Sequence, residues 1–186
     1  MASLMALTAL GAREPAVVEI GPLRITERTD LALASVAARR GRMADLAAAA
    51  QTAGVPLPEA ARHQAGTSYS AFWTAPEMWF VEAPFGSHEM IADLLKTTLG
   101  DAASVTEQTD AWVAFDLAAA DPAPLLERLC NVDFRAVPKG YATRTVVEHL
   151  GVYLVKLDQG TVRLYGPRSS AESLLHALEG AAASAW

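Results

Sequence analysis

Two apolar-rich stretches near the middle of the chain have the length and composition of strands, and a proline-containing turn separates them. Residues 70–74 and 78–83 are the two predicted strands. The intervening residues 75–77 predict a tight connection, because Pro76 supplies the fixed φ that a turn needs. The pattern therefore predicts a hairpin over residues 70–83.

Four aromatic residues lie within this hairpin, in the run "FWTAPEMWF" of residues 72–80. Because side chains alternate between the faces of a strand, Trp73 and Trp79 are expected to pair on one face, with Phe72 and Phe80 on the other. Both pairs are expected in the core, or one pair in the core and the other in an interface. A nucleic-acid platform would need neighbouring Lys or Arg, and residues 65–89 contain none.

Helical periodicity and start signals predict four helices. The first begins at Met43, repeats apolar positions at Leu46, Ala47 and Ala50, and ends at Gly54, which favours a left-handed cap. The others begin at a Ser87 cap, at an Asp121 cap followed by a proline, and at a capping box over residues 169–172. Their expected apolar faces are Met90, Ile91, Leu94, Leu95 and Leu99; Leu125, Leu126, Leu129 and Cys130; and Ala171, Leu174, Leu175 and Leu178.

Alternating or β-branched runs predict the remaining strands, at residues 17–20, 31–36, 113–117, 143–149, 152–157 and 161–166. Val105 is expected to extend the strand at 113–117 backwards. Leu150-Gly151 and residues 158–160 are the expected connections between the last three strands. Residues 55–66 have no period and predict a linker.

The order strand, strand, helix occurs at residues 70–99 and again at 152–178. That order predicts an α+β fold with antiparallel sheets, helices on one face of each sheet and two ββα-type halves. The expected organisation is an N-terminal arm over residues 1–15 and one α+β domain over 16–186, with subdomains at about 16–110 and 111–186.

The amino-acid composition limits the classes of function that this protein can have. The net charge is −6, the pI is about 5.2 and no basic run occurs, which argues against a nucleic-acid partner. Charged residues make up 19%, against about 25% in an average globular domain. This predicts either a surface that a partner covers or a simple alanine-rich bias.

The first twelve residues are apolar and small, but no Lys or Arg precedes them, so an export signal is not expected. We expect an arm that becomes ordered on a partner. No stretch is long and apolar enough to cross a membrane, so no membrane partner is expected. The single cysteine, Cys130, excludes an internal disulfide framework and favours a cytoplasmic location.

Motifs for chemistry are lacking. The chain has neither G-x-G-x-x-G nor a P-loop, and its histidines at 63, 88, 149 and 176 are not spaced as metal ligands. Cys130 is expected to be buried and inert, and Asp110, Asp116, Asp121 and Asp133 form no evident acid–base pair. The sequence therefore predicts no catalytic, cofactor-binding or metal residue in this chain.

Two basic turns are the remaining candidates for a ligand site. Lys139, Tyr141 and Arg144 surround the glycine turn of residues 138–144, and Arg168 precedes the last predicted helix, where an anion can bind. The structural reading is favoured for both turns, the first as exposed basic residues beside a glycine and the second as a helix cap.

Six segments, taken in order, carry a family resemblance: "WTAPEMWFV", "TDAWVAFDL", "LLERLCNVDF", "PKGYATRT", "EHLGVYLV" and "RLYGPRSSAESLLHALE". Together they resemble the gamma subunit of heterotetrameric sarcosine oxidase over about residues 69–179. The resemblance implies a fold like that of the folate-binding aminomethyltransferases, the glycine-cleavage T-protein type.

The same resemblance implies a cytoplasmic complex with alpha, beta and delta subunits, in which this chain contacts chiefly alpha. That complex demethylates sarcosine to glycine and yields hydrogen peroxide with formaldehyde or 5,10-methylenetetrahydrofolate. FAD, FMN, NAD, tetrahydrofolate and zinc are expected in the other subunits. The gamma type carries no known catalytic residue, so the chain is expected to be a structural part of an oxidoreductase.

Three alternatives remain open, one of which is a stand-alone binding protein. The chain is also similar to the corresponding subunit of N-methylglutamate dehydrogenase, which would change the substrate of the complex. The T-protein type of fold would also suit a small folate-dependent one-carbon transferase.

Overall fold

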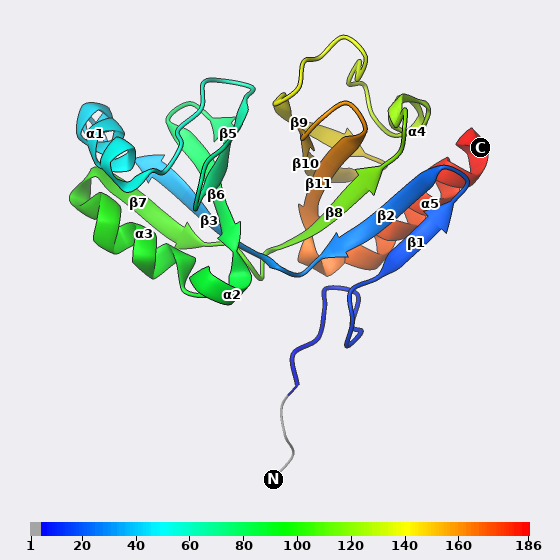
Figure 1. Ribbon diagram of the computed structural model, residues 1–186, viewed down its shortest axis with the longest axis horizontal. Helices are drawn as coiled ribbons and strands as arrows, with labels where there is room; N and C mark the ends of the chain where they lie inside the picture. The colour runs from blue at the N-terminus through cyan, green and yellow to red at the C-terminus, as the bar shows by residue number, and fades with distance from the viewer. Residues whose placement is uncertain (1–4) are drawn as a thin grey trace.

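The computed structural model describes residues 5–186, which form two antiparallel sheets facing each other with helices on their outer sides (Figure 1). Sheet A has six strands in the order β1 (Val17–Ile20), β2 (Leu23–Arg28), β8 (Trp112–Ala118), β11 (Thr161–Pro167), β10 (Leu150–Lys156) and β9 (Ala142–Val147). Sheet B has five strands in the order β4 (His63–Ala65), β5 (Ser70–Ala75), β6 (Met78–Pro84), β3 (Leu31–Ala38) and β7 (Ala103–Glu107). The predicted α+β class with antiparallel sheets is confirmed.

The helices lie on the sides of the sheets that face away from each other. Helices α1 (Met43–Ala53) and α3 (Ile91–Leu99) pack on sheet B, and α4 (Ala123–Leu129) and α5 (Ala171–Ala185) pack on sheet A. The short elements are α2 (Phe85–His88) and the 3₁₀ turns η1 (Gly100–Ala102) and η2 (Arg168–Ser170). Among residues 5–186, no helix is long and apolar enough to span a bilayer.

Both sheets are built from the same succession of elements. Along the chain, β3, α1, β4, β5, β6 and α3 correspond to β8, α4, β9, β10, β11 and α5. The strand orders agree as well, since β7-β3-β6-β5-β4 matches β2-β8-β11-β10-β9. Strand β7 lies beside β3 in sheet B and comes from the same half of the chain as the other strands of that sheet. The equivalent position in sheet A, beside β8, is occupied by β2, which comes from the start of the chain.

The N-terminal strands β1 and β2 therefore belong with the C-terminal half. The register of β2 against β8, with Ile25 opposite Leu117, places it inside sheet A. The subdomains expected from the sequence, at about 16–110 and 111–186, assign these two strands to the first half of the chain. Strand β2 is also an element that the sequence pattern did not predict.

Three apolar clusters hold these layers together. One lies between sheet A and its helices, with Phe115 and Leu174 fully buried, and one lies between sheet B and its helices, with Leu46 and Leu95 fully buried. The third lies between the two sheets and contains Phe72, Phe80, Tyr165, Val155, Leu33, Ala114 and Ala142. Removal of so much apolar area from water stabilises the two-sheet arrangement.

The aromatic hairpin has the predicted pairing. Trp73 lies opposite Trp79, and Phe72 lies opposite Phe80. The phenylalanines are in the cluster between the sheets, while the tryptophans pack on the helix side, where Trp79 Nε1 donates a hydrogen bond to the Pro58 carbonyl at 2.8 Å. Phe72, Phe80 and Trp79 are therefore core residues, and Trp73 packs partly buried against the helix side.

Several local predictions of helix ends were wrong and others were confirmed. Gly54 caps α1 in the left-handed conformation at φ 68°, and the Asp121 carboxylate accepts a hydrogen bond from the Ala123 amide at 3.0 Å. Ser87, by contrast, lies inside α2, and α3 begins only at Ile91. Met90 and Leu94, predicted on the apolar face, are exposed, since the buried face of α3 is formed by Ile91, Ala92, Leu95 and Leu99.

The prediction of a capping box over residues 169–172 is also wrong, because α5 starts without a side-chain cap after the 3₁₀ turn η2. Val105 does not extend β8 but lies on β7, which pairs with β3 in the other sheet. The turn between β9 and β10 is Glu148-His149, with Glu148 at φ 54°, whereas Leu150 and Gly151 are paired strand residues. The predicted linker contains the short strand β4.

Replacing Gly166 with alanine is expected to destabilise the protein. A Cβ atom at Gly166 would lie 2.5 Å from Leu174 Cδ2, and Leu174 is fully buried, so its side chain has little room to move. Overpacking of this kind costs about 1–3 kcal/mol. Urea unfolding of the variant measures the loss.

Gly180→Ala in α5 is the matched control, because nothing lies within 4 Å of a Cβ at that position. Alanine favours a helix over glycine by about 0.5–1 kcal/mol, so this variant should be slightly more stable. Equal midpoints for the two variants would contradict the packing described for Gly166.

Candidate functional site

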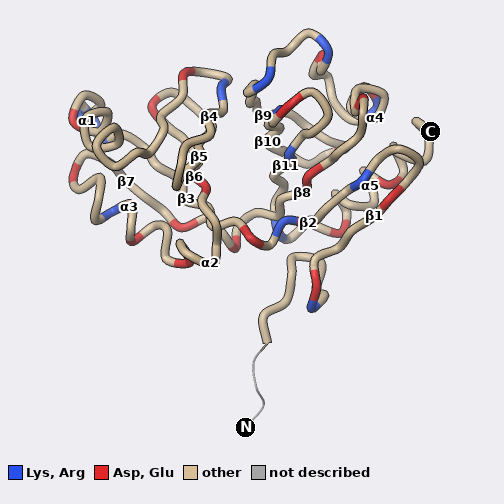
Figure 2. Tube along the Cα trace, in the orientation of Figure 1, with Lys and Arg blue, Asp and Glu red and all other residues tan. Residues whose placement is uncertain are grey.

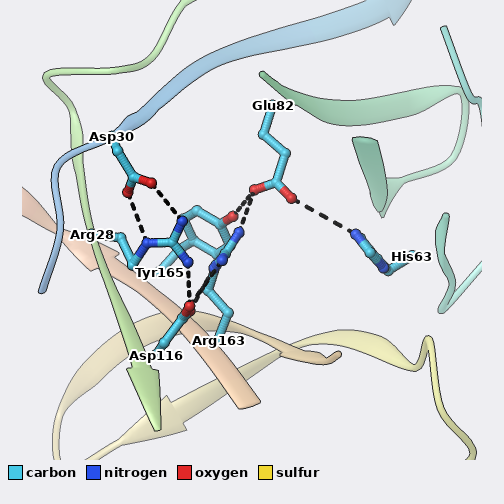
Figure 3. Close-up of polar contacts among 7 residues, drawn as sticks. All are labelled: Arg28, Asp30, His63, Glu82, Asp116, Arg163 and Tyr165. Atoms are coloured by element: carbon cyan, nitrogen blue, oxygen red, sulfur yellow. Dashed lines mark hydrogen bonds and ion pairs between the residues drawn. The ribbon is translucent and has the colours of Figure 1, made fainter. Parts of the chain in front are cut away.

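A cluster of charged and polar side chains lies between the two sheets (Figure 3). Its members come from both sheets and from the link between β2 and β3, and they make contacts over long distances in the sequence. They are Arg28, Asp30, His63, Glu82, Asp116, Arg163 and Tyr165. We refer to these seven residues as the inter-sheet cluster.

Arg163 is the centre of the cluster. Its Nε and Nη2 atoms donate to the two oxygens of Asp116 at 2.6 and 2.9 Å, which is the bidentate geometry of a strong ion pair. Its Nη1 atom donates to Glu82 Oε2 at 3.1 Å, so the guanidinium joins β11 and β8 of sheet A to β6 of sheet B. Arg163 and Glu82 lie on β11 and β6, which occupy corresponding positions in the two sheets.

Arg28 forms the second ion-pair group, nearer to the surface. Its Nε and Nη2 atoms donate to the two oxygens of Asp30, both at 2.7 Å, and its Nη1 atom donates to Asp116 at 2.5 Å. The hydrogen bonds from Arg28 lower the pKa of Asp30 below its usual range. Asp116 therefore connects both arginines.

Glu82 is the most deeply buried acid of the cluster, with a side chain 7% exposed. Its Oε2 atom accepts hydrogen bonds from Arg163 and from the Tyr165 hydroxyl. Its Oε1 atom lies 3.7 Å from His63 Nε2, which is too long for a hydrogen bond. That Nε2 atom is buried and has no hydrogen-bond partner within the described chain.

The environment of Glu82 favours its ionised form. Burial alone would raise the pKa, but the neighbouring His63, the charge of Arg163 and the Tyr165 hydroxyl outweigh it and set the pKa at about 2. We assign the lowering chiefly to Arg163 and Tyr165, because His63 is beyond hydrogen-bonding distance. Burial and the nearby Glu82 charge raise the pKa of Tyr165, so this phenol remains a donor.

The arrangement is suited to holding the sheets together rather than to reacting. Every guanidinium nitrogen that faces the cluster donates to a carboxylate, and the Tyr165 hydroxyl is also engaged. Cys130 lies away from the cluster at the end of α4, and burial raises the pKa of its thiol, which disfavours the reactive thiolate. Within residues 5–186, no group of three or more His, Cys, Asp or Glu side chains is placed to hold a metal ion.

A cavity of about 310 Å³ adjoins the cluster where the N-terminal segment passes β2 and β8. Arg28 and Tyr165 form its border with the cluster, and the other walls include Leu33, Phe85, Trp112 and Arg168. A second cavity, of about 270 Å³, opens on the side of Asp30, Ser70 and Glu82. Both cavities have mixed apolar and charged walls.

The two basic turns singled out in the sequence do not converge on one site. The turn before β9 joins the two sheets, because the Gly140 carbonyl accepts a hydrogen bond from the His63 amide at 2.7 Å and Tyr141 bridges to Arg62. Lys139 and Arg144 are exposed. Arg168, before the start of α5, donates to the Leu7 carbonyl at 3.0 Å and lies 3.7 Å from Asp110.

Lowering the pH is expected to remove the contribution of Glu82 to stability. Its folded pKa of about 2 lies below the ordinary value of 4.5, so the contribution is complete above pH 4.5 and is lost as the pH falls towards 2. By pH 3 the loss should amount to about 2 kcal/mol. Urea unfolding at pH 7 and pH 3 measures this loss. We expect the free energy of unfolding to fall by about 2 kcal/mol less in Glu82→Gln than in the unchanged chain. Identical pH profiles would mean that Glu82 is not held ionised.

Comparisons with known proteins point to one fold. No family model matches the chain, and no curated protein does. The chain is similar to one in the structure of heterotetrameric sarcosine oxidase from Corynebacterium sp. U-96 in complex with pyrrole 2-carboxylate, with TM-score 0.73 and 22% identity over 90% of this chain and 87% of that one. It is also similar to the glycine cleavage system aminomethyltransferase T from Bartonella henselae, with TM-score 0.61 and 12% identity over 83% of this chain and 44% of that one. The chain therefore has the α+β fold shared by a chain of that oxidase and by part of the aminomethyltransferase.

Proposed function

We propose that the chain is the gamma-type structural subunit of a cytoplasmic heterotetrameric sarcosine oxidase and carries no active site of its own. The complex would convert sarcosine to glycine, with hydrogen peroxide and formaldehyde or 5,10-methylenetetrahydrofolate as the other products. Its alpha, beta and delta subunits, chiefly alpha, would be the partners of this chain. FAD, FMN, NAD, tetrahydrofolate and zinc would be bound in those subunits.

The observation that carries this proposal is the extent of the structural match. The chain aligns over 90% of its own length with 87% of a chain in the sarcosine oxidase structure, so the two are similar as whole chains. Against the aminomethyltransferase, the chain spans only 44% of the other protein. A whole-chain match favours an equivalent part of an assembly over a shortened transferase.

The inter-sheet cluster supports a structural role. Its arginines and its tyrosine are already paired with carboxylates, and His63, whose Nε2 has no partner, is enclosed with a side chain 10% exposed. A general base or nucleophile needs a group that a substrate can reach. The low content of charged residues, 19%, agrees with a surface that is partly covered in an assembly.

Co-expression with the neighbouring genes tests the proposal. A tag at the C-terminus, beside Trp186, allows the chain to be purified and the absorption spectrum and sarcosine-dependent peroxide formation of the product to be recorded. We expect a yellow, multi-subunit product that oxidises sarcosine. Oxidation of N-methylglutamate in place of sarcosine would assign the chain to the related dehydrogenase instead.

A folate-dependent one-carbon transferase is the second candidate, favoured by the likeness to the aminomethyltransferase. It predicts that the purified chain alone binds tetrahydrofolate. Titration of the isolated chain, followed by tryptophan fluorescence, decides this point, because Trp112 lines the cavity of about 310 Å³. Saturable binding by the chain alone would favour the transferase, and we expect none.

A further inference from the structure

The cavity of about 310 Å³ beside the inter-sheet cluster is bordered on one side by residues 6–13, which we call the N-terminal segment. Its other walls include residues of β2, β3 and β8. Basic and acidic positions are interspersed along the base of the segment and the adjoining end of β2 (Figure 2). Small-molecule sites usually measure about 300–1,000 Å³, so this cavity has room for a small ligand.

The N-terminal segment is fixed against the rest of the chain at two points. Glu27, only 2% exposed, accepts hydrogen bonds from the Leu10 amide at 3.4 Å and from the Ala16 amide at 3.0 Å. Nearer the start of the segment, Arg168 Nη2 donates to the Leu7 carbonyl at 3.0 Å. The wall that the segment forms is therefore already in place, and a ligand would not have to order it.

Several polar groups of the cavity are already committed to partners within the chain. Arg28 donates through three nitrogen atoms to Asp30 and Asp116, and the Tyr165 hydroxyl donates to Glu82. These groups form part of the wall, but a ligand would have to break strong charge-assisted bonds to use them. The polar recognition of a ligand must therefore come from other residues.

Two arginines of the cavity retain unused donors. Arg168 approaches a carboxylate only at 3.7 Å, from Asp110, whose side chain is 94% exposed, and such exposed pairs are weak. Its bond to the Leu7 carbonyl uses one of the five N–H groups of a guanidinium. Within residues 5–186, the side chain of Arg13 forms no hydrogen bond or ion pair. Guanidinium groups with spare donors favour a carboxylate, which they can bind through two parallel hydrogen bonds.

The remaining walls are suited to an apolar body. Leu33, Phe85 and Trp112 line the cavity, and Trp112 Nε1 already donates to Gln108 Oε1 at 3.1 Å, which leaves the indole ring for apolar contact. Aromatic and aliphatic walls with a few polar groups at one place are typical of small-molecule sites.

The charges of the cavity disfavour a ligand with an ammonium group. Arg13, Arg28 and Arg168 all line the cavity and would repel a cation. The buried acid, Glu27, is already bonded to two backbone amides of the N-terminal region. An anion therefore fits the walls better than a cation or a zwitterion.

We infer that this cavity binds a small monocarboxylate with an apolar body, whose carboxylate group is held by Arg168 and Arg13. The apolar body lies against Phe85 and Trp112. This inference goes beyond the proposed structural role, because that role assigns no ligand to this chain.

The test is a calorimetric titration of the full-length chain with benzoate and, separately, with benzamide. The two probes have the same ring and nearly the same shape, but only benzoate carries a charge. We expect saturable binding of benzoate that is at least about tenfold tighter than that of benzamide, because only the carboxylate makes charge-assisted hydrogen bonds. Equal affinities for the two probes, or no binding of benzoate, would overturn the inference.

Arginine variants of the full-length chain locate the site. We expect Arg168→Met and Arg13→Met each to weaken benzoate binding, the former by at least about tenfold, and to leave benzamide binding unchanged. Arg24→Met is the matched control, because Arg24 lies on sheet A in an exposed pair with Glu19 and does not line the cavity. Arg13 is exposed, so its variant tests the site even if Arg168→Met loosens the N-terminal segment.

The control also separates a built site from general attraction of an anion. If Arg24→Met weakens benzoate binding as much as the two cavity variants do, the charge of the whole chain binds the probe and the inference is overturned. Undiminished binding by both Arg168→Met and Arg13→Met overturns it as well. Loss of binding in the cavity variants alone supports it.

Discussion

Replacing Arg163 with methionine is expected to lower the free energy of unfolding by about 3–5 kcal/mol, because it leaves the buried Glu82 carboxylate without its ion-pair partner and removes one of the two arginines that pair with Asp116. Arg163 is 8% exposed at its side chain and makes ion pairs with Asp116 and Glu82. Methionine has a similar length and fills the space, so the loss comes mainly from the uncompensated charges. Urea unfolding at pH 7 measures it.

Two further variants separate this charge effect from other causes. Arg24→Met removes an arginine of the same sheet whose pair with Glu19 is exposed, and exposed pairs contribute about 0–1 kcal/mol. Adding Glu82→Gln to Arg163→Met should restore part of the stability, because it removes the carboxylate that is left without an ion-pair partner. If the losses in free energy of unfolding of Glu82→Gln and Arg163→Met simply add in the double variant, that result contradicts the ion pair between the two sheets.

Replacing Phe72 with alanine is expected to cost about 3–5 kcal/mol, the usual range for a fully buried phenylalanine. Phe72 is 1% exposed between the sheets, and its ring lies 5.0 Å from that of Tyr165 and 5.4 Å from that of Phe80. The change would leave a cavity between the layers and would remove aromatic contacts as well. Thermal and urea unfolding of the variant measure the effect.

Phe85→Ala provides the comparison, because Phe85 is only partly buried, at the start of α2. We expect it to cost clearly less than Phe72→Ala. Phe72→Leu, which keeps most of the volume, should cost less than about 1.5 kcal/mol. If Phe72→Ala were no more harmful than Phe85→Ala, the sheets would not be held together by the apolar cluster that contains Phe72.

Local features of the fold were predictable because the residues that determine them are close in the sequence. The hairpin of β5 and β6 follows from two strand-like runs around Pro76, and the end of α1 follows from Gly54. Side-chain alternation then gave the pairing of Trp73 with Trp79. These features need no information from the other half of the chain.

Sheet membership was not predictable in the same way, because it depends on pairing between distant segments. Strand β2 joins β8, and Val105 on β7 joins β3 rather than extending β8. Short strands such as β4 have too few residues to show a period. The repeated succession of elements in the two halves was visible only in part, since β2 completes sheet A from the opposite end of the chain.

The inter-sheet cluster was missed for a related reason. Glu82 and Arg163 are 81 residues apart, so no local spacing pattern connects them. A weaker signal existed, because each is a charged residue inside an otherwise apolar strand, at "MWFVEAP" and "TVRLYGP". Buried charges are rarely tolerated without a partner, so two such strands of opposite charge suggest a pair.

The measurement that tests the central claim most directly is the native mass of the chain purified with its co-expressed neighbours. The chain has a mass of 19.7 kDa. Membership of an oxidase complex predicts one species in which a single copy of this chain is bound to three other subunits, with flavin retained and sarcosine-dependent peroxide formed. A colourless species of 19.7 kDa, with the neighbouring gene products eluting separately, would contradict the account.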